Sequence, residues 1–233
     1  MNTLILTGAG ISAESGIPTF RDVAGLWESH DLRQIASPET FARDPALVHR
    51  FYNQRRRQLV SGEVRPNAAH FALGELQRHF PEQITLVTQN VDNLHERGGA
   101  KRVLHMHGEL LKVRCVACQT RRQWLGDLST EDACPICGCR LRPDIVWFGE
   151  LPFCLEAIEA ALSVAELFVS IGTSGLAYPA AGFVDRARQR GIYTLEINLR
   201  PTTHHQGFTE GRYGLASVEV PRWVEERLHA VEA

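Results

Sequence analysis

The beginning of the chain constrains its fold more than any other part of the sequence. An apolar, β-branched run at residues 4–7 predicts a buried strand. Gly8 and Gly10 follow, so the backbone of the turn after the strand can approach a ligand without a Cβ in the way. Ser12 and Glu14 are typical of a helix start, where free backbone N–H groups face outward. A strand, a glycine turn and a helix N-terminus together predict an anion site that suits a dinucleotide pyrophosphate.

The spacing of the glycines departs from the usual dinucleotide-binding motif. That motif is Gly-x-Gly-x-x-Gly, whereas here the third glycine, Gly16, lies six residues after Gly10. A plain glycine turn between a strand and a helix is therefore the alternative. The loop that follows carries Phe20 and Arg21, and a loop of this kind can fold over a cofactor and shield a reactive bond from water.

The composition is that of an ordinary globular protein. The 233 residues carry a formal net charge of −2, with 44% hydrophobic and 22% charged residues. This length suits one large domain with a small insert, and the charge gives no general attraction to nucleic acid or anionic membranes. No apolar run approaches the roughly 20 residues that cross a bilayer, and the first strand begins too early to leave room for a leader peptide. We therefore expect a cytoplasmic protein without a membrane partner. Its oligomeric state is open, and a monomer is compatible with the sequence.

Four of the six cysteines form two Cys-x-x-Cys pairs, which predict a metal site. The pairs are Cys115 with Cys118 and Cys134 with Cys137, and fifteen residues separate them. Four thiolates fit tetrahedral zinc and leave it no open position, so the zinc should be structural. Cys139 offers a competing register for the last ligand. Arginines are frequent nearby, but the aromatic and basic pattern of nucleic-acid readers is absent, so we expect no nucleic-acid partner.

Apolar periodicity and turn residues predict alternating strands and helices. Further strands are expected at residues 83–88, 166–171 and 192–197 and near Val218. Helices are expected at residues 45–59, 67–80, 155–162 and 178–190, from Pro221 onward, and after a cap at Ser37. In the helix at residues 67–80, the expected buried stripe is Ala68, Phe71, Ala72 and Leu76.

Three stretches resemble the sirtuins, the NAD-consuming protein-lysine deacylases. They are GAGISAESGIPTFR at residues 8–21, TQNVDNLH at residues 88–95 and His107-Gly108, and the resemblance extends over nearly the whole chain. It implies an α/β fold in which a Rossmann-like parallel sheet carries a small zinc-binding domain and a helical insertion. The implied Rossmann-like domain comprises residues 1–24, 66–109 and 148–233. The helical insertion comprises residues 25–65 and the zinc-binding domain residues 110–147.

The resemblance also implies which residues bind NAD as a co-substrate. They lie in turns along the whole chain: Gly8, Ala9, Gly10, Glu14, Phe20, Arg21, Trp27, Gln89, Asn90, Val91, Asp92, Gly172, Thr173, Ser174, Asn198, Leu199, Arg200 and Ala216. His107 would be the catalytic base and His105 a structural partner. Two histidines two residues apart lie on opposite faces of a strand, but the choice between them rests on the resemblance.

A further pattern concerns the acyl group. Tyr52 and Arg55 lie at i and i+3 of a predicted helix and hence on one face, where a phenol and a guanidinium can bind a carboxylate. Arg55 begins a run of three arginines, for which a solvated helix face is the alternative. Tyr-x-x-Arg resembles the branch of the sirtuins that removes succinyl and malonyl groups. The resemblance implies that the following residues contact the acyl-lysine: Ala36, Tyr52, Arg55, Val146, Phe148, Gly149 and Glu150.

The implied reaction removes acetyl, succinyl or malonyl groups from protein lysines. It consumes NAD and water and gives nicotinamide, O-acyl-ADP-ribose and free lysine, with His107 accepting a proton from the ribose hydroxyls. Two other enzyme classes stay open on the residues alone. A hydride-transferring dehydrogenase would leave NADH, and a mono-ADP-ribosyltransferase would leave ADP-ribose on a protein. The sequence identifies neither the protein substrates nor the preferred acyl group.

Overall fold

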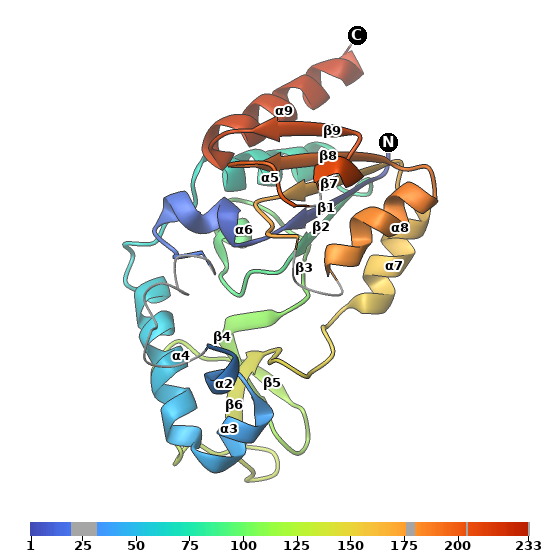
Figure 1. Cartoon of the computed structure of the whole chain (residues 1–233). Helices are drawn as coiled ribbons and strands as arrows, with labels where there is room; N and C mark the ends of the chain where they lie inside the picture. The colour runs from blue at the N-terminus through green and yellow to red at the C-terminus, as the bar shows by residue number, and fades with distance from the viewer. Residues whose placement is uncertain (20–31, 176–179, 204, 233) are drawn as a thin grey trace.

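The computed structural model describes residues 1–19, 32–175, 180–203 and 205–232 (Figure 1). Three of the predicted NAD contacts, Phe20, Arg21 and Trp27, lie outside these ranges. The described strands form two sheets, a larger parallel one and a smaller antiparallel one. Figure 1 shows the larger sheet with its helices in one part of the molecule, and the smaller sheet with α2, α3 and α4 in the other.

The larger sheet has six described strands, all parallel, in the order β3-β2-β1-β7-β8-β9. The strands are β1 (Thr3–Thr7), β2 (Ile84–Thr88), β3 (Val103–His105), β7 (Leu167–Ile171), β8 (Tyr193–Asn198) and β9 (Glu210–Tyr213). β1 and β7 are buried along their whole length, which is why their sequences are continuous apolar runs. The chain extends from β1 to β3 on one side and from β7 to β9 on the other. Ligands of such sheets bind at the carboxyl ends of the strands, where the order reverses, here between β1 and β7.

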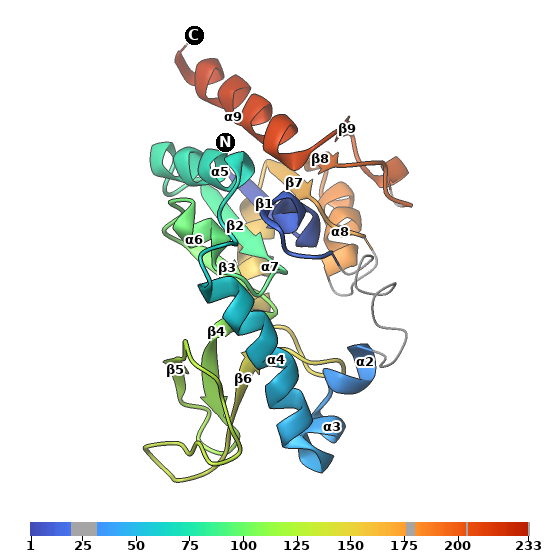
Figure 2. The same ribbon diagram turned by 90° about the vertical axis from the view of Figure 1, so that its left-hand side faces the viewer.

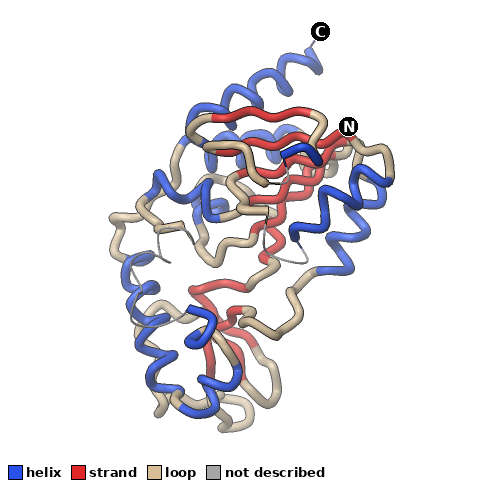
Figure 3. The backbone as a smooth tube through the Cα atoms, viewed as in Figure 1, coloured by secondary structure: helices blue, strands red, loops and turns tan. Residues whose placement is uncertain are grey.

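Helices cover both faces of the parallel sheet (Figures 1 and 3). One face packs Ile5 of β1 against α5 (Ala68–His79) and α9 (Ala216–Glu232). The other face packs Leu4 and Leu6 against α7 (Leu155–Val164) and α8 (Phe183–Gln189), as the alternation of side chains along a strand requires. Shorter helices lie in the connections: η1 (Ala9–Ser15), α6 (Leu94–Arg97), η2 (Ala180–Gly182) and η3 (His205–Gly207). The predicted α/β class with a Rossmann-like parallel sheet is confirmed.

The smaller sheet is antiparallel and lies beside a group of helices. Its strands, in the order β5-β4-β6, are β4 (Gly108–Cys115), β5 (Arg121–Gln123) and β6 (Leu141–Ile145). The helices are α2 (Leu32–Ile35), α3 (Pro38–Arg43) and α4 (Pro45–Val60). Figure 2 shows α4 alongside β6, and their shared core includes Phe51, Tyr52, Ile145 and Trp147. The predicted domain boundaries stay a prediction. Contacts between the helices and residues 110–147, here called the zinc segment, run across these boundaries.

The helix predictions hold where a cap marks the start of the helix. The Ser37 side chain accepts a hydrogen bond from the Thr40 N–H, and α4 begins at Pro45 as expected. α5 begins after Asn67, but its predicted buried stripe is wrong at Ala68 and Phe71. Both are exposed, and the buried apolar side chains are Ala69, Ala72, Leu73 and Leu76, which share one helix face. None of the described helices is long and apolar enough to span a membrane.

The C-terminal prediction of a strand near Val218 and a helix from Pro221 is wrong. The last strand is β9, earlier in the chain, and α9 runs continuously from Ala216 with Pro221 inside it. The buried residues Val220, Trp223 and Val224 have helical spacing and pack on the parallel sheet. Their burial outweighs the backbone hydrogen bond that proline cannot donate in the second turn of the helix. The predicted helix at residues 178–190 is also divided, since η2 precedes α8.

Candidate active site

The turn after β1 packs directly against the turn after β7. A Cβ on Gly8 would lie 2.9 Å from the Gly172 carbonyl oxygen, and a Cβ on Gly10 would lie 2.8 Å from the Gly172 Cα. Gly172 itself has a φ of 62°, in the left-handed region that favours glycine. The expectation that Gly8 and Gly10 let the backbone approach a ligand stays a prediction, and the structure gives the two glycines a further reason. Their missing side chains let two adjacent turns at the carboxyl edge of the sheet come together.

The predicted helix start after β1 also differs from the structure. η1 is a 3₁₀ helix that already begins at Ala9. The Gly10 N–H donates to the Gly172 oxygen at 2.9 Å and the Ile11 N–H to the Gly8 oxygen at 3.1 Å. Among the described residues no acceptor takes the Ala9 N–H. Of these three N–H groups, the half-buried Ala9 thus offers the one that remains available to an anion.

The Glu14 carboxylate joins η1 to α9. It accepts hydrogen bonds from the Ser217 N–H at 3.0 Å and from the Ser217 hydroxyl at 2.6 Å. Ser217 lies in the first turn of α9, where a carboxylate satisfies a free N–H and complements the helix dipole. Two predicted cofactor contacts from opposite ends of the chain, Glu14 and Ala216, are thereby neighbours.

The loop after β2 is fixed by a buried polar network. Asp92 is 6% exposed and accepts from the Ser12 hydroxyl at 3.0 Å and from the Leu94 N–H at 3.0 Å. The Asn90 side-chain amide donates to the Ser12 hydroxyl at 3.1 Å and to the Gly8 oxygen at 3.2 Å. Burial raises the pKa of Asp92, against the lowering effect of its hydrogen bonds. The network holds the loops after β1 and β2 together, beside Val91, whose carbonyl accepts from Leu110.

His107 lies in the turn between β3 and β4, half-buried at the carboxyl edge of the sheet. The expectation that the two histidines lie on opposite faces of one strand does not apply, because β3 ends at His105 and β4 begins at Gly108. His107 Nδ1 lies 3.0 Å from the Gln89 carbonyl oxygen. A carbonyl only accepts, so Nδ1 carries the proton and Nε2 keeps its lone pair. Burial lowers the pKa of His107, which keeps the ring neutral and able to accept a proton at neutral pH.

His105 is in a different environment. Its Nε2 lies 2.7 Å from a Glu96 carboxylate oxygen, and the residue is 8% exposed. Burial alone would lower the pKa of His105, but the Glu96 carboxylate outweighs burial and the pKa is raised. The pKa shifts of the two histidines are therefore opposite in direction, and His107, with its lowered pKa, has the properties of a base.

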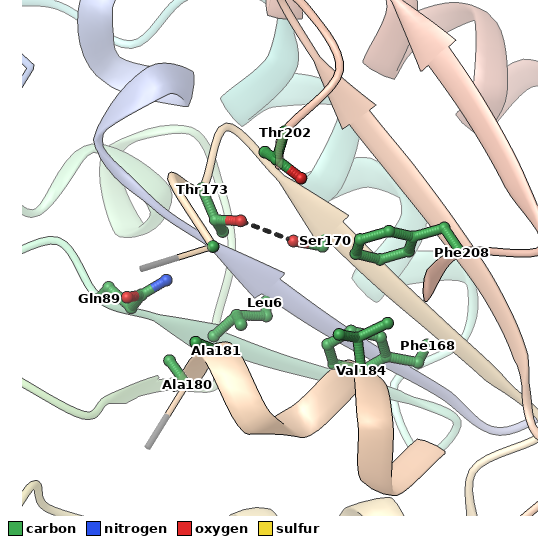
Figure 4. Close-up of a pocket in the computed structure, with 11 residues that line it drawn as sticks. Leu6, Gln89, Phe168, Ser170, Thr173, Ala180, Ala181, Val184, Thr202 and Phe208 are labelled. Carbon is green, nitrogen blue, oxygen red and sulfur yellow. Dashed lines mark hydrogen bonds between the residues drawn. The ribbon is translucent and has the colours of Figure 1, made fainter. Parts of the chain in front are cut away.

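The turns after β7 and β8 form the other side of this edge. The Asn198 amide donates to the Thr173 oxygen at 2.8 Å, and the Thr173 hydroxyl lies 2.8 Å from that of Ser170. Figure 4 shows a small pocket here, between Gln89 and Thr173 at the strand ends and apolar side chains of η2 and α8. Ser174 is half-buried, whereas Leu199 and Arg200 are exposed beyond the end of β8. The predicted contacts from β1, β2 and β7 are thus gathered at one edge, with those from β8 at its rim.

Tyr52 packs from α4 into the core shared with the smaller sheet, and Arg55 follows it by three residues on the same helix. Tyr52 is 5% exposed, and its hydroxyl accepts a hydrogen bond from the Trp147 indole N–H at 3.0 Å. The Arg55 guanidinium donates to the Phe51 oxygen at 3.0 Å and lies over the Phe51 ring. Burial lowers the pKa of Arg55 to about 10 and raises the pKa of Tyr52 to about 12, so at neutral pH the guanidinium is charged and the phenol is protonated. Arg55 is therefore not part of a fully solvated face.

The segment after β6 connects this pair with His107. The Val146 N–H donates to the His107 oxygen at 2.9 Å, and the Phe148 N–H donates to the Ala36 oxygen at 3.0 Å. Between them, Trp147 is 2% exposed and reaches Tyr52. The sequence analysis missed Trp147. Its aromatic side chain in an unexpectedly apolar loop was the available signal, but the partner is 95 residues away in sequence.

The Glu150 side chain points toward arginines. Its carboxylate accepts from Arg142 at 2.6 and 2.9 Å, from Arg114 at 3.1 Å and from the Trp147 N–H at 2.8 Å. Burial alone would raise the pKa of Glu150, but the hydrogen bonds from Arg142 and the Trp147 N–H outweigh it and lower the pKa. Phe148 and Gly149 are exposed in the same segment. The Glu150 carboxylate is thus paired within the protein and orients Arg142 and Trp147.

The four predicted zinc ligands come together at the far end of β4. All four Sγ atoms of Cys115, Cys118, Cys134 and Cys137 lie within 4.8 Å of one another. The separations of 3.4 Å for Cys115–Cys137 and 3.6 Å for Cys118–Cys134 are close to the edge of about 3.8 Å expected for tetrahedral Zn–S bonds of about 2.3 Å. Cys139 is outside this group and packs against its small core. The four-cysteine register is confirmed, and the donor set fits structural zinc.

Comparison with known proteins agrees with this arrangement. A sequence model of the Sir2 family matches residues 8–179. An NAD-dependent protein deacylase of Vibrio vulnificus is 55% identical over 234 residues, covering 100% of this chain and 96% of the relative.

Two solved structures are also similar. A crystal structure of a Sir2 homologue with NAD has a TM-score of 0.88 at 36% identity and covers 98% of this chain and 90% of its own. A mutant Sir2 homologue with 2′-O-acetyl ADP ribose has a TM-score of 0.89 at 36% identity, covering 100% of this chain and 94% of its own. The match to the family over most of its length, together with the similarity to the deacylase over its whole length, shows that this chain belongs to the Sir2 family.

Proposed function

We propose that the protein is an NAD-dependent protein-lysine deacylase that removes acidic acyl groups, succinyl and malonyl, as well as acetyl. The observation that carries the proposal is one continuous set of contacts that connects His107 with Tyr52 and Arg55. The His107 oxygen accepts from the Val146 N–H, and the next residue, Trp147, donates to Tyr52 beside Arg55. An acyl-lysine lying along this segment would reach from the carboxyl edge of the sheet to the phenol and guanidinium of α4.

The residues at the sheet edge fit NAD as a co-substrate. The Ala9 N–H offers a donor for a phosphate oxygen. Gln89, Asn90, Val91 and Asp92 would contact the nicotinamide and its ribose, and the turns after β7 and β8 the adenosine, with Glu14 and Ala216 nearby. NAD supplies an ADP-ribosyl group to which the acyl group is transferred, with release of nicotinamide. The catalytic part of this chain is His107, whose neutral Nε2 accepts a proton from a ribose hydroxyl.

Arg55 and Tyr52 suit a carboxylate on the acyl chain. A buried carboxylate is costly unless it is paired and hydrogen-bonded. Arg55 supplies the positive charge, and Tyr52 a hydroxyl that stays protonated at neutral pH. Acetyl-lysine has no such charge, so its turnover should depend much less on this pair.

Mass spectrometry of matched acetyl-lysine and succinyl-lysine peptides, with and without NAD, tests the proposal. We expect NAD-dependent loss of both acyl groups and formation of O-acyl-ADP-ribose. Mass gain by ADP-ribose on a protein, without acyl loss, would instead identify a mono-ADP-ribosyltransferase. Loss of acetyl alone would remove the acidic-acyl part of the proposal and keep the deacylase.

Arg55→Met sharpens the test of acyl choice. It should weaken succinyl-peptide binding by about 2–5 kcal/mol, as for a truncated buried charge pair, and leave acetyl turnover largely intact. Arg57→Met is the matched control, because Arg57 is exposed and pairs with Asp127 at 2.8 Å. Equal losses on the two substrates would contradict a carboxylate clamp. The cytoplasmic location stays a prediction, and the protein substrates and the oligomeric state stay open.

A further inference from the structure

We propose that Trp147 is a positioning residue for the choice of acyl group, because its indole N–H fixes the direction in which the Tyr52 hydroxyl donates. The inference rests on the proposed function of Tyr52 and Arg55 as a carboxylate clamp. It assigns acyl selectivity to a residue outside the Tyr-x-x-Arg pattern.

The direction of the Trp147–Tyr52 hydrogen bond follows from chemistry. An indole N–H is only a donor, so at 3.0 Å the Tyr52 oxygen is the acceptor. A phenol has one proton to donate, and accepting the indole N–H leaves that proton for another partner. Among the described residues no acceptor takes it. Tyr52 thus has its acceptor side occupied by Trp147 and its donor side available beside Arg55.

Trp147 is itself held firmly in place. The Arg142 guanidinium carbon lies 3.3 Å from the centre of the indole ring, and the Phe41 ring lies at a centroid distance of 5.2 Å. The Trp147 backbone N–H donates to Glu150 at 2.8 Å. A cation over the ring face draws electron density from the indole and strengthens its N–H as a donor. The ring is therefore oriented by contacts on several sides and has little freedom to rotate away from Tyr52.

Arg142 is oriented in turn by Glu150. The guanidinium forms a two-pronged pair with the carboxylate at 2.6 and 2.9 Å and also donates to the Ile145 oxygen at 2.9 Å. Such paired hydrogen bonds fix the plane of a guanidinium. The contacts Glu150–Arg142–Trp147–Tyr52 form one connected set that ends at Tyr52 on α4, three residues from Arg55.

Trp147→Phe tests this role because it removes the N–H and retains an aromatic ring for Arg142 and Phe41. We expect KM for a succinyl-lysine peptide to rise about 3- to 10-fold, the size of one net hydrogen bond, with kcat little changed. KM for the matched acetyl-lysine peptide should stay within about twofold. Trp124→Phe is the matched control, since its indole donates to the Asp127 oxygen in the zinc segment, away from Tyr52. Similar changes on both peptides would overturn the inference.

A double-mutant cycle shows whether Trp147 acts through Tyr52. In a Tyr52→Phe background there is no hydroxyl to orient, so Trp147→Phe should have no additional effect on succinyl KM. Additive effects of the two substitutions would overturn the inference. If wild-type enzyme does not turn over the succinyl peptide, or Arg55→Met affects both peptides equally, the proposed function fails. If Arg55→Met selectively weakens succinyl turnover but the effects of Trp147→Phe and Tyr52→Phe on succinyl KM add, only the inference fails.

A spectroscopic measurement covers the case in which Trp147→Phe does not fold. The chain has four tryptophans, and Tyr52→Phe should shift one indole N–H signal in an NMR spectrum of nitrogen-15-labelled protein. A succinyl-lysine peptide should shift the same signal more than an acetyl-lysine peptide does. An indole spectrum that Tyr52→Phe or the succinyl peptide leaves unchanged would overturn the inference.

Discussion

The parallel sheet and the smaller antiparallel sheet are stabilised by different kinds of contacts. The parallel sheet packs an extended apolar cluster on each face, with strands such as β1 and β7 buried throughout. The core next to the zinc site has five buried residues, of which two, Cys115 and Cys134, are zinc ligands. Its sheet also buries charged side chains, including Arg114, Arg142 and Asp144. The stability of the parallel sheet is spread over many contacts, whereas that of the smaller sheet depends on a few groups.

The smaller sheet gains further support from α4. Asn53 of α4 exchanges two hydrogen bonds of 2.9 Å with the backbone of Leu128 in the zinc segment. Arg56 is 0% exposed and donates to the Leu110 oxygen of β4 at 3.1 Å. The zinc segment thereby holds α4, and α4 carries Tyr52 and Arg55. We therefore expect that damage to the smaller sheet weakens acyl binding more than it disturbs the catalytic edge of the parallel sheet.

Loss of zinc should have the largest effect. Structural zinc contributes on the order of 10–16 kcal/mol of apparent binding free energy, far more than a core of this size can replace. Cys134→Ala, or a strong chelator, should destabilise the smaller sheet selectively, so that it unfolds at a lower temperature than the parallel sheet. Thermal unfolding followed by circular dichroism should then show a separate, lower transition, together with loss of bound zinc.

Cys139→Ala is the matched control for zinc loss, because Cys139 lies outside the four-sulfur group. It should retain the metal and one unfolding transition. Retention of zinc by Cys137→Ala and its loss from Cys139→Ala would mean that the competing register is used. A single unchanged transition after chelation would contradict the contrast between the two sheets.

Removing the carboxylate that pairs with two buried arginines of the smaller sheet should have the next largest effect. Glu150→Gln leaves Arg142 and Arg114 without their shared carboxylate and should cost about 3–5 kcal/mol of unfolding free energy. Glu75→Gln is the comparison in the other region, because Glu75 on α5 forms an exposed pair with Arg78 at 3.6 Å. That change should cost no more than about 1 kcal/mol. Urea unfolding of the two variants measures both values, and similar costs would contradict the contrast.

The contrast also explains how much of the fold was predictable from sequence. The strands of the parallel sheet are predicted to within a residue at β1, β2, β7 and β8, because burial on both faces leaves a continuous apolar run. The zinc ligands are predictable because tetrahedral thiolate coordination requires a recognisable spacing. Both signals are local in the sequence.

Errors arose where distant residues decide the structure. The buried face of α5 excludes Phe71 because α5 packs on both the sheet and α9, and α9 tolerates Pro221 because Trp223 is buried there. Gly8 and Gly10 also let the turn at Gly172 pack closely, a contact between distant segments that the sequence does not reveal. Trp147 was missed because only the fold brings it to Tyr52. The candidate site was therefore predicted as a set of residues, but not the contacts that orient them.

Low pH should destabilise the region of the parallel sheet through a buried histidine, with a smaller loss of unfolding free energy than the changes above. His70 of α5 is 0% exposed, and burial lowers its pKa to about 4 from 6.5. Below about pH 6.5 the unfolded chain binds a proton that the folded protein excludes. The free energy of unfolding therefore has its full value above about pH 6.5 and falls as the pH drops from there to about 4. The change from 6.5 to about 4 corresponds to roughly 3 kcal/mol.

His70→Gln should flatten the dependence of urea midpoints on pH between about 7 and 4.5. His79→Gln on the same helix is the control, because His79 is exposed and should leave the slope unchanged. Buried His95, whose pKa is also lowered by burial, should preserve part of the slope in His70→Gln. Equal slopes in wild type and His70→Gln would mean that His70 does not carry this sensitivity.

His107, where the two regions meet, should show the smallest effect on stability and a large one on activity. Its side chain has one described hydrogen bond, to the Gln89 oxygen, so His107→Ala should cost only about 1 kcal/mol. Loss of the base should lower kcat/KM by about 10²–10⁴ on acetyl and succinyl peptides alike. This equal loss distinguishes His107 from Arg55 and Trp147, whose substitution should affect the succinyl peptide selectively.

The pH profile of the wild-type enzyme tests the same assignment. Because burial lowers the pKa of His107, the acidic limb of kcat/KM should lie below the ordinary histidine value of 6.5. His105, whose pKa is raised, would place that limb above 6.5 if it were the base. A limb above 6.5 that His105→Gln removes would transfer the catalytic role to His105. A limb below 6.5, with His105→Gln still active, would leave His107 as the base and its neutral Nε2 as the group that accepts the proton.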